Sequence, residues 1–217
     1  RLVGSEMCIR DRLIRIKLNP AISPAANAQK YYKDYQKAKN AEHILTEQIE
    51  KGRSELEYID SVLDTVSRAE SERELAQIRE ELTEQGYLRK QKGKQRPQAA
   101  LPPLEFTSSD GFKILVGRNN TQNDKLTLKI ANKNDMWLHT KDIHGSHTVV
   151  FAEGREISDT AILEAAQLAA YYSKARESSQ VPVDYTLVRY VSKPSGARPG
   201  ICLLYTSPSP RDGATSR

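Results

Sequence analysis

Cysteine and long apolar runs are what this sequence of 217 residues has least of. Its two cysteines, Cys8 and Cys202, lie close to the ends, so between them we expect neither disulfides nor cysteine-based zinc sites. No apolar run approaches the roughly 20 residues that a helix needs to cross a bilayer. The start of the chain also lacks an apolar core of signal-peptide length. These absences predict a soluble, cytoplasmic protein.

Several common catalytic motifs are missing as well. The sequence has no G-x-x-x-x-G-K-[ST] phosphate loop, no G-x-S-x-G nucleophile elbow and no H-E-x-x-H zinc helix. The corresponding nucleotide, acyl-transfer and zinc-protease sites are therefore excluded.

Charge is present but unevenly distributed. The net charge of +5 and pI of about 9.1 permit nucleic-acid binding without requiring it. Residues 13–88 carry 11 cations and 14 anions, whereas residues 104–200 carry 12 and 11. Arg89–Arg96 carries five cations and no anion. We interpret residues 89–103, which also hold three prolines, as a basic linker. Such a run is either simply solvated or, beside a polyanion, a phosphate-binding strap.

The two ends share no pattern with their neighbours. Residues 1–12 and 201–217 resemble translated adaptor DNA. We expect these ends to lie outside the evolved fold, as tags do.

Residues 13–88 predict an antiparallel helical coiled-coil hairpin. Leu13–Leu18 alternates like an edge strand, and Ser23 followed by Pro24 is a typical helix start. Apolar residues then recur in steps of three and four, which predicts a heptad seam. The seam consists of Ala28, Tyr31, Tyr35, Ala38, Leu45, Ile49, Leu56, Ile59, Leu63, Val66, Leu75, Ile78 and Leu82.

Capping signals divide these helices. Capping boxes begin at Ser54 and Ser71, and glycines at 52 and 86 are candidate helix ends. We predict two or three helices, with a turn near Gly52, near Arg68–Ser71, or at both. The hairpin is either a structural spacer or an arm that touches a large partner. Three tyrosines, Tyr31, Tyr32 and Tyr35, favour a packed base for it.

Residues 104–200 predict a mixed α+β domain of ordinary size. Its expected elements are a hairpin turning at Ser109–Gly111, a short helix over Lys125–Ala131 capped by Asn123 or Asp124, a helix over Ser158–Arg176 with a small-residue face, and a strand over Val181–Val191.

The stretch Asp135–Phe151 holds the only tryptophan and three of the four histidines. It predicts two short strands around a glycine-containing turn. Four interpretations remain open: a structural corner, a metal site of His139 and His147 around Asp142, a nucleophile at Ser146, or a polyanion site. For the last, rings stack on bases while cations and amides hold the backbone. The candidate residues are Arg118, Asn119, Gln122, Asn123, Trp137, His139, Lys141, His147, Lys193 and Arg198.

Ordered motifs extend this interpretation. The runs VGRNNTQND (Val116–Asp124), DMWLHTKDIHGSH (Asp135–His147) and KPSGARPG (Lys193–Gly200) resemble the R domain of the NFACT family. LNPAISPAANAQKYYKDYQKAKNAE (Leu18–Glu42) resembles that family's coiled-coil middle domain.

The resemblance implies an RNA-binding factor of ribosome-associated quality control. Such factors bind large ribosomal subunits obstructed by peptidyl-tRNA, recruit tRNA, and promote alanine tailing of the stalled chain. Peptide-bond chemistry belongs to the ribosome, so the resemblance implies no enzyme, no cofactor, no small-molecule substrate and no membrane. Two alternatives remain: a fibronectin-binding surface adhesin, the label of some Gram-positive relatives, and a His-dependent metal enzyme.

Overall fold

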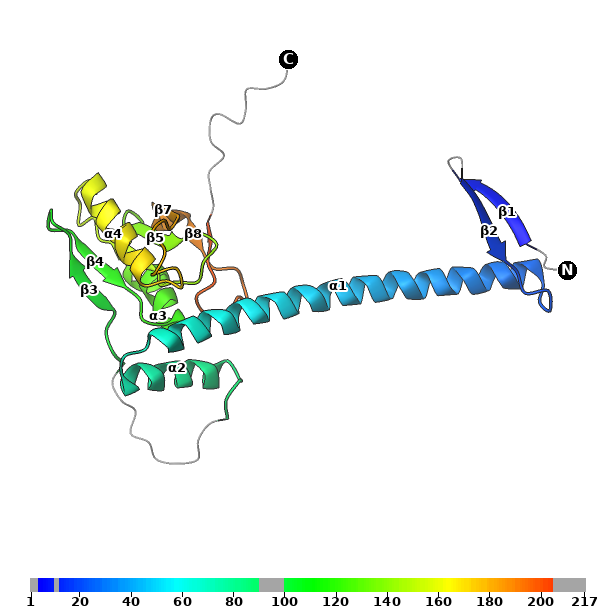
Figure 1. Cartoon of the computed structure of the whole chain (residues 1–217), viewed down its shortest axis with the longest axis horizontal. Helices are drawn as coiled ribbons and strands as arrows, with labels where there is room; N and C mark the ends of the chain where they lie inside the picture. The colour runs from blue at the N-terminus through cyan, green and yellow to red at the C-terminus, as the bar shows by residue number, and fades with distance from the viewer. Residues whose placement is uncertain (1–3, 10–11, 90–99, 205–217) are drawn as a thin grey trace, which may run out of the picture. The chain divides into compact units, whose positions relative to one another are not determined.

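A computed structural model describes residues 4–9, 12–89 and 100–204 (Figure 1). It divides into two compact units, Arg1–Glu55 and Leu56–Arg217. The expected boundaries lay instead at a linker over 89–103. Most of that basic linker, including Lys90, Lys92, Lys94 and Arg96, lies outside the described residues. No helix in the described ranges is long and apolar enough to cross a membrane.

The first unit begins with an antiparallel hairpin of β1 (Gly4–Ile9) and β2 (Arg12–Lys17). The strand predicted over Leu13–Leu18 is thus confirmed. β1 falls within residues 1–12, the first of the two ends that we expected to lie outside the fold. The short β9 (Leu203–Leu204), which pairs with β8 (Val191–Ser192), falls within the second end, residues 201–217. The rest of the second end, 205–217, lies outside the described residues.

Helix α1 (Pro24–Arg68) starts where the sequence predicts. The Ser23 hydroxyl accepts a hydrogen bond from the Ala26 amide at 3.2 Å, the usual N-cap contact. Asn27 holds the turn before it, because its buried amide accepts from Asn19 N at 2.8 Å and donates to Asn19 O at 3.0 Å.

The predicted break at Gly52 is wrong, because α1 continues through it to Arg68. The capping box at Ser54 therefore lies inside a helix. A mid-helix glycine costs only about 1 kcal/mol relative to alanine, which a long helix tolerates.

The second predicted turn is confirmed. Helix α2 (Glu72–Glu84) follows it, and the Ser71 hydroxyl accepts from the Glu74 amide at 3.3 Å. The helix ends before Gly86, whose φ of +84° is the left-handed conformation that glycine adopts readily.

The buried stripe of the hairpin matches the predicted seam only in part. Of the seam residues, Ile78 is buried, and Ile59 and Leu82 pack against it. Tyr58 and Val62, which the seam omits, are buried, whereas its residues Leu56 and Leu63 are 66% and 65% exposed. The residues buried on α1 lie on the side of the helix that packs against α2 and the sheet domain, and a periodicity cannot specify that side. The tyrosines predicted to form a packed base, Tyr31, Tyr32 and Tyr35, are also exposed.

The second unit contains a five-stranded antiparallel sheet in the order β3-β4-β6-β5-β7. This confirms the predicted α+β class. The strands are β3 (Leu104–Thr107), β4 (Lys113–Val116), β5 (Met136–Thr140), β6 (Thr148–Val150) and β7 (Val183–Leu187). The turn at Ser109–Gly111 joins β3 to β4 as predicted.

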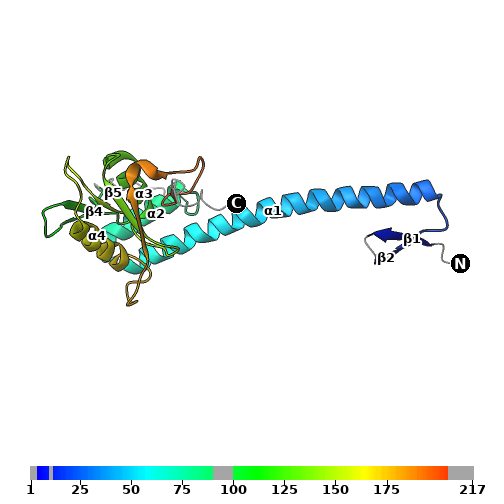
Figure 2. The same cartoon turned by 90° about the horizontal axis from the view of Figure 1, so that it is seen from above.

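Alternation along the strands separates two core clusters. Ile114, Leu138 and Val150 pack with the alanines of α4 (Asp159–Tyr171), while Leu115, Trp137 and Val149 pack with Leu126. Figure 2 shows α4 and α3 (Asn120–Lys125) on opposite sides of the strands.

Helix boundaries near α3 and α4 differ slightly from the predicted ones. The predicted helix over Lys125–Ala131 is present, as the end of α3 and a π-helical turn, η1 (Leu126–Ile130). Its cap is Asn119, however, and not Asn123 or Asp124. Ser158 caps α4 as predicted, but α4 ends at Tyr171 instead of Arg176. After β7 the chain forms a 3₁₀ turn, η2 (Val188–Tyr190), so the predicted strand is shorter.

The small-residue face of α4 generates a prediction. Ala161, Ala165 and Ala169 are fully buried against the sheet. We expect Ala165→Leu to lower the free energy of unfolding by about 1–3 kcal/mol, because extra methylenes overpack this contact. Gln167→Leu, on the exposed side of the same helix, should change it by less than about 0.5 kcal/mol. Urea unfolding compares the two variants, and equal effects would contradict the close packing.

Candidate nucleic-acid interface

Three of the recognised motifs meet at one place, which we call the motif junction (Gly117, Asn123, His147 and Gly200). The Asn123 Oδ1 atom accepts a hydrogen bond from the His147 amide at 3.1 Å. The Gly117 amide donates to the His147 carbonyl at 3.0 Å, and the Gly200 amide donates to Asp124 Oδ1 at 3.0 Å. The motifs are therefore held together by backbone amides that donate to side-chain and backbone oxygens.

Two glycines are required at this junction. A Cβ at Gly117 would lie 2.0 Å from Asn123 Oδ1. A Cβ at Gly200 would lie 2.6 Å from Asn120 Oδ1, and Gly200 also has a φ of +82°. Both positions exclude a side chain, since the approach of the neighbouring amide leaves no space.

The rings of Trp137, His139 and His147 form a cluster. The ring centroid of Trp137 lies 5.7 Å from that of His139 and 5.1 Å from that of His147. Trp137 is only 3% exposed and His147 only 2%. These two rings belong to the core and offer no surface on which a base could stack. Trp137 Nε1 has no hydrogen-bond partner within the described part of the chain.

Burial keeps both histidines neutral. It lowers the pKa of His147 to about 3, with the neighbouring His139 as the next cause. The same desolvation lowers the pKa of His139, against which backbone hydrogen bonds at Gly145 and Thr140 act. His147 Nδ1 lies 2.8 Å from the Thr127 hydroxyl. The cluster thus packs as a structural corner of the core, in which the Trp137 Nε1 atom is left without a described partner.

The metal interpretation of this stretch gains no support. Across residues 4–9, 12–89 and 100–204, no group of three or more His, Cys, Asp or Glu side chains is placed to hold an ion. His147 lies in the core, whereas Asp142 is exposed in the turn.

Three predicted phosphate-binding cations are engaged within the chain. Arg118 pairs with Glu74 of α2, and Lys193 pairs with Asp124. The guanidinium of Arg198 lies 5.6 Å and 5.1 Å from the ring centroids of Tyr58 and Tyr87 and donates to Gln85. These side chains attach the helical hairpin and the C-terminal loop to the sheet domain.

The remaining predicted residues are mostly structural too. The Asn119 side chain caps α3 by accepting from the Gln122 amide at 2.8 Å. The Gln122 side chain accepts from the Arg118 amide at 3.0 Å. All ten predicted residues are described, and among them only the side chain of Lys141 is classed as exposed.

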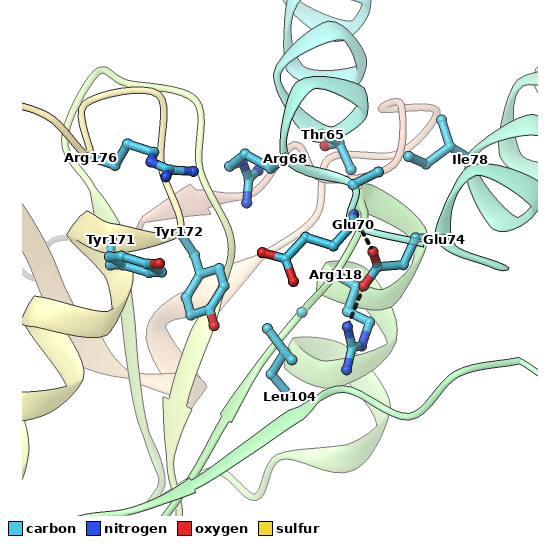
Figure 3. A pocket seen from close by; sticks show the side chains of 12 residues that line it. Thr65, Arg68, Glu70, Glu74, Ile78, Leu104, Arg118, Tyr171, Tyr172 and Arg176 are labelled. Carbon is cyan, nitrogen blue, oxygen red and sulfur yellow. Dashed lines mark hydrogen bonds and ion pairs between the residues drawn. The ribbon is translucent and has the colours of Figure 1, made fainter. Parts of the chain in front are cut away.

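Polar contacts dock the hairpin onto this domain. The buried carboxylate of Glu81 accepts from the Tyr58 hydroxyl at 3.0 Å and from the Thr121 amide at 3.1 Å. Burial, followed by the Glu81 charge, raises the pKa of Tyr58. Figure 3 shows a pocket where the helical hairpin meets the sheet domain, between the turn from α1 to α2 and the end of α4. Its arginines Arg68 and Arg118 are paired with Asp64 and Glu74, so they offer an anion little free charge.

A different cationic surface was missed in the sequence. We call it the lysine face: Lys125, Lys129, Lys133 and Arg189, all exposed. The Arg189 amide donates to the Lys133 carbonyl at 3.3 Å, which joins η2 to the segment after η1. The Ala131 amide bonds the Leu126 carbonyl at 2.9 Å, the five-residue step of a π-turn, a feature frequent at functional sites.

No acid interrupts this face in the sequence. Residues 125–134 contain three lysines and no Asp or Glu, and residues 185–200 contain three cations and no Asp or Glu. The spacing of four residues between the lysines was the available signal. That spacing does not include Arg189, because only the fold brings residue 189 beside residue 133.

An α+β domain with a cluster of exposed cations has the electrostatic footprint of the nucleic-acid-binding class of proteins. Comparisons agree: residues 103–200 match the model of the NFACT protein RNA binding domain, and residues 6–100 match that of the NFACT N-terminal and middle domains. The chain is a member of the NFACT family.

Individual relatives are similar over most of this chain. It is 50% identical over 190 residues to the Bacillus subtilis protein named Rqc2 homolog RqcH, and 43% identical over 194 residues to the Streptococcus pneumoniae protein of that name. These alignments cover 86% and 89% of this chain but 33% and 34% of the relatives, so the chain spans about a third of their length.

A solved structure is also similar. It is the C-terminal part of the fibronectin/fibrinogen-binding protein from Streptococcus suis, with a TM-score of 0.79 and 41% identity. The match covers 86% of this chain and 74% of that chain.

The neutral histidines generate a prediction. An unfolded histidine takes up a proton near pH 6.5, whereas folded His147 stays neutral down to about pH 3. The free energy of unfolding should therefore fall as the pH drops below 6.5, by about 1.4 kcal/mol per pH unit for each such group. Urea titrations between neutral pH and pH 5 measure this. His43→Gln, at an exposed histidine, should keep the slope, and a flat profile in the unaltered chain would contradict it.

Proposed function

We propose that this chain is the middle and RNA-binding part of a ribosome-associated quality-control factor. The factor binds large ribosomal subunits obstructed by peptidyl-tRNA, recruits tRNA, and promotes C-terminal alanine tailing of the stalled nascent chain in the cytoplasm. Because the chain spans about a third of its relatives, tailing is proposed for the whole protein and RNA binding for this part.

The lysine face is the observation that carries RNA binding. Its four cations are exposed, and none of them forms an ion pair with a described residue. The three lysines can therefore meet phosphate without losing an internal ion pair, whereas Arg189 already lies over the ring of Tyr190. The match to an RNA-binding domain model over the same residues supports this role.

The proposed role is one of binding and positioning. Of the two histidines with lowered pKa values, His147 is buried in the core and His139 is half-buried beside it. Peptide-bond formation on an obstructed subunit would remain the ribosome's chemistry, and this chain would contribute affinity and orientation.

Co-sedimentation tests the proposal. We expect the 217-residue chain to pellet with purified large ribosomal subunits, and more tightly with subunits that carry peptidyl-tRNA. Binding should weaken steeply with rising salt, because phosphate contacts release counterions. Purified small subunits serve as the control particle. A chain that stays in the supernatant with large subunits, or pellets equally with both, would exclude a role specific to the large subunit.

The name of the similar Streptococcus suis protein supports a second candidate, an adhesin for fibronectin or fibrinogen. That candidate requires saturable binding to immobilised fibronectin at physiological salt. We expect only weak, salt-sensitive adsorption, since the exposed charge of the lysine face attracts proteins mainly by electrostatics. Surface plasmon resonance with the unaltered chain and with Lys129→Glu/Lys133→Glu measures it. Saturable binding that both proteins share would favour the adhesin.

A further inference from the structure

The lysine face also indicates whether this domain binds single-stranded or double-helical RNA. This inference rests on the proposed RNA binding. Single-stranded RNA is held mainly by bases stacked on exposed aromatic rings, whereas double-helical RNA is held through phosphates and 2′-hydroxyls. The two modes need different side chains, so the surface of the domain distinguishes them.

A stacking platform is lacking within the described residues 104–204. Trp137 and His147 are buried. The exposed aromatic residues are Tyr171, Tyr185 and Tyr190, which lie on α4, β7 and η2 and form no ring pair with one another. Arginines already cover two of these rings: Arg176 lies 5.5 Å from the centroid of Tyr171, and Arg189 lies 5.1 Å from that of Tyr190.

The lysine face has what a duplex requires. Lys125 ends α3 and Lys129 lies in η1, so these two exposed lysines belong to one short helical segment. Two exposed amide side chains, Asn132 and Asn134, flank Lys133 and can bond 2′-hydroxyls. Leu128 and Ile130 between the lysines are 44% and 39% exposed, which gives apolar contact to sugar rings.

The arrangement of these side chains also fits the minor groove of a double-helical RNA. The minor groove of A-form RNA is wide and shallow, and it displays the 2′-hydroxyls between two phosphate strands. The exposed side chains of η1 and of the following turn project from one short segment, and Arg189 adds a cation beside Lys133. We infer that the lysine face binds the sugar–phosphate backbone of double-helical RNA across its minor groove.

Fluorescence anisotropy with the full chain tests this inference. The probes are a blunt RNA duplex of about 16 base pairs, one of its strands alone, and a DNA duplex of the same sequence. We expect the RNA duplex to bind tightest. Lys129→Glu/Lys133→Glu should weaken duplex binding by about tenfold or more and reduce the salt slope by about two.

Two further variants separate specific from general effects. Lys37→Glu/Lys174→Glu makes the same charge change at exposed lysines outside the lysine face, on α1 and after the end of α4, and duplex binding should stay within about twofold. Asn132→Ala/Asn134→Ala should reduce the preference for RNA over DNA duplex, because DNA lacks the 2′-hydroxyl.

Three results would overturn the inference. In the first, the single strand binds as tightly as the duplex. In the second, the control pair weakens binding as much as the lysine-face pair, which would leave RNA binding itself intact. In the third, the unaltered chain binds none of the RNA probes, which would also remove the proposed function.

Discussion

The buried side chain of Asn123 is the contact on which this domain depends. Its amide oxygen occupies the space that a Cβ of Gly117 would fill and accepts the hydrogen bond of the His147 amide. Three chain segments thus converge on one amide that is 3% exposed. A buried polar group without its partner costs about 1–3 kcal/mol, so this contact holds α3 against β4 and β6. The position of the lysine face follows from it, because that face begins where α3 ends.

Some cations around the motif junction form contacts within the chain, and others remain available to phosphate. The neighbouring residues of each cation determine which of the two applies. Arg118, Lys193 and Arg198 meet a carboxylate, a second carboxylate and two tyrosine rings, so their charge contributes to docking the hairpin and the C-terminal loop. Lys129 and Lys133 have no such partner among the described residues, so their charge stays available to phosphate. A lysine or arginine that already forms an internal ion pair would have to give up that pair to bind phosphate, whereas an unpaired one would not.

Local chemistry made part of the fold predictable. Ser71 and Ser158 cap helices because a hydroxyl satisfies an amide within three residues, and Gly86 follows a helix end because of its positive φ. Gly52 shows the limit, since the same residue type inside α1 ends nothing. For a related reason, the heptad seam was wrong for part of α1, although Ile78 on α2 is buried as predicted. Periodicity predicts that one stripe is buried, but α2 and the sheet domain determined that Tyr58 and Val62 form it rather than Leu56 and Leu63.

The sequence by itself determined most of the elements of the sheet domain, the α+β class and the family, because these depend on local patterns and on ordered motifs. It also marked the motif residues as important. Only the tertiary structure decided what they do: Trp137, Asn123 and His147 are buried and hold the fold together, whereas Lys129, Lys133 and Arg189 remain at the surface. Exposure to solvent and the partner of a charge depend on segments distant in sequence, and no local spacing encodes them.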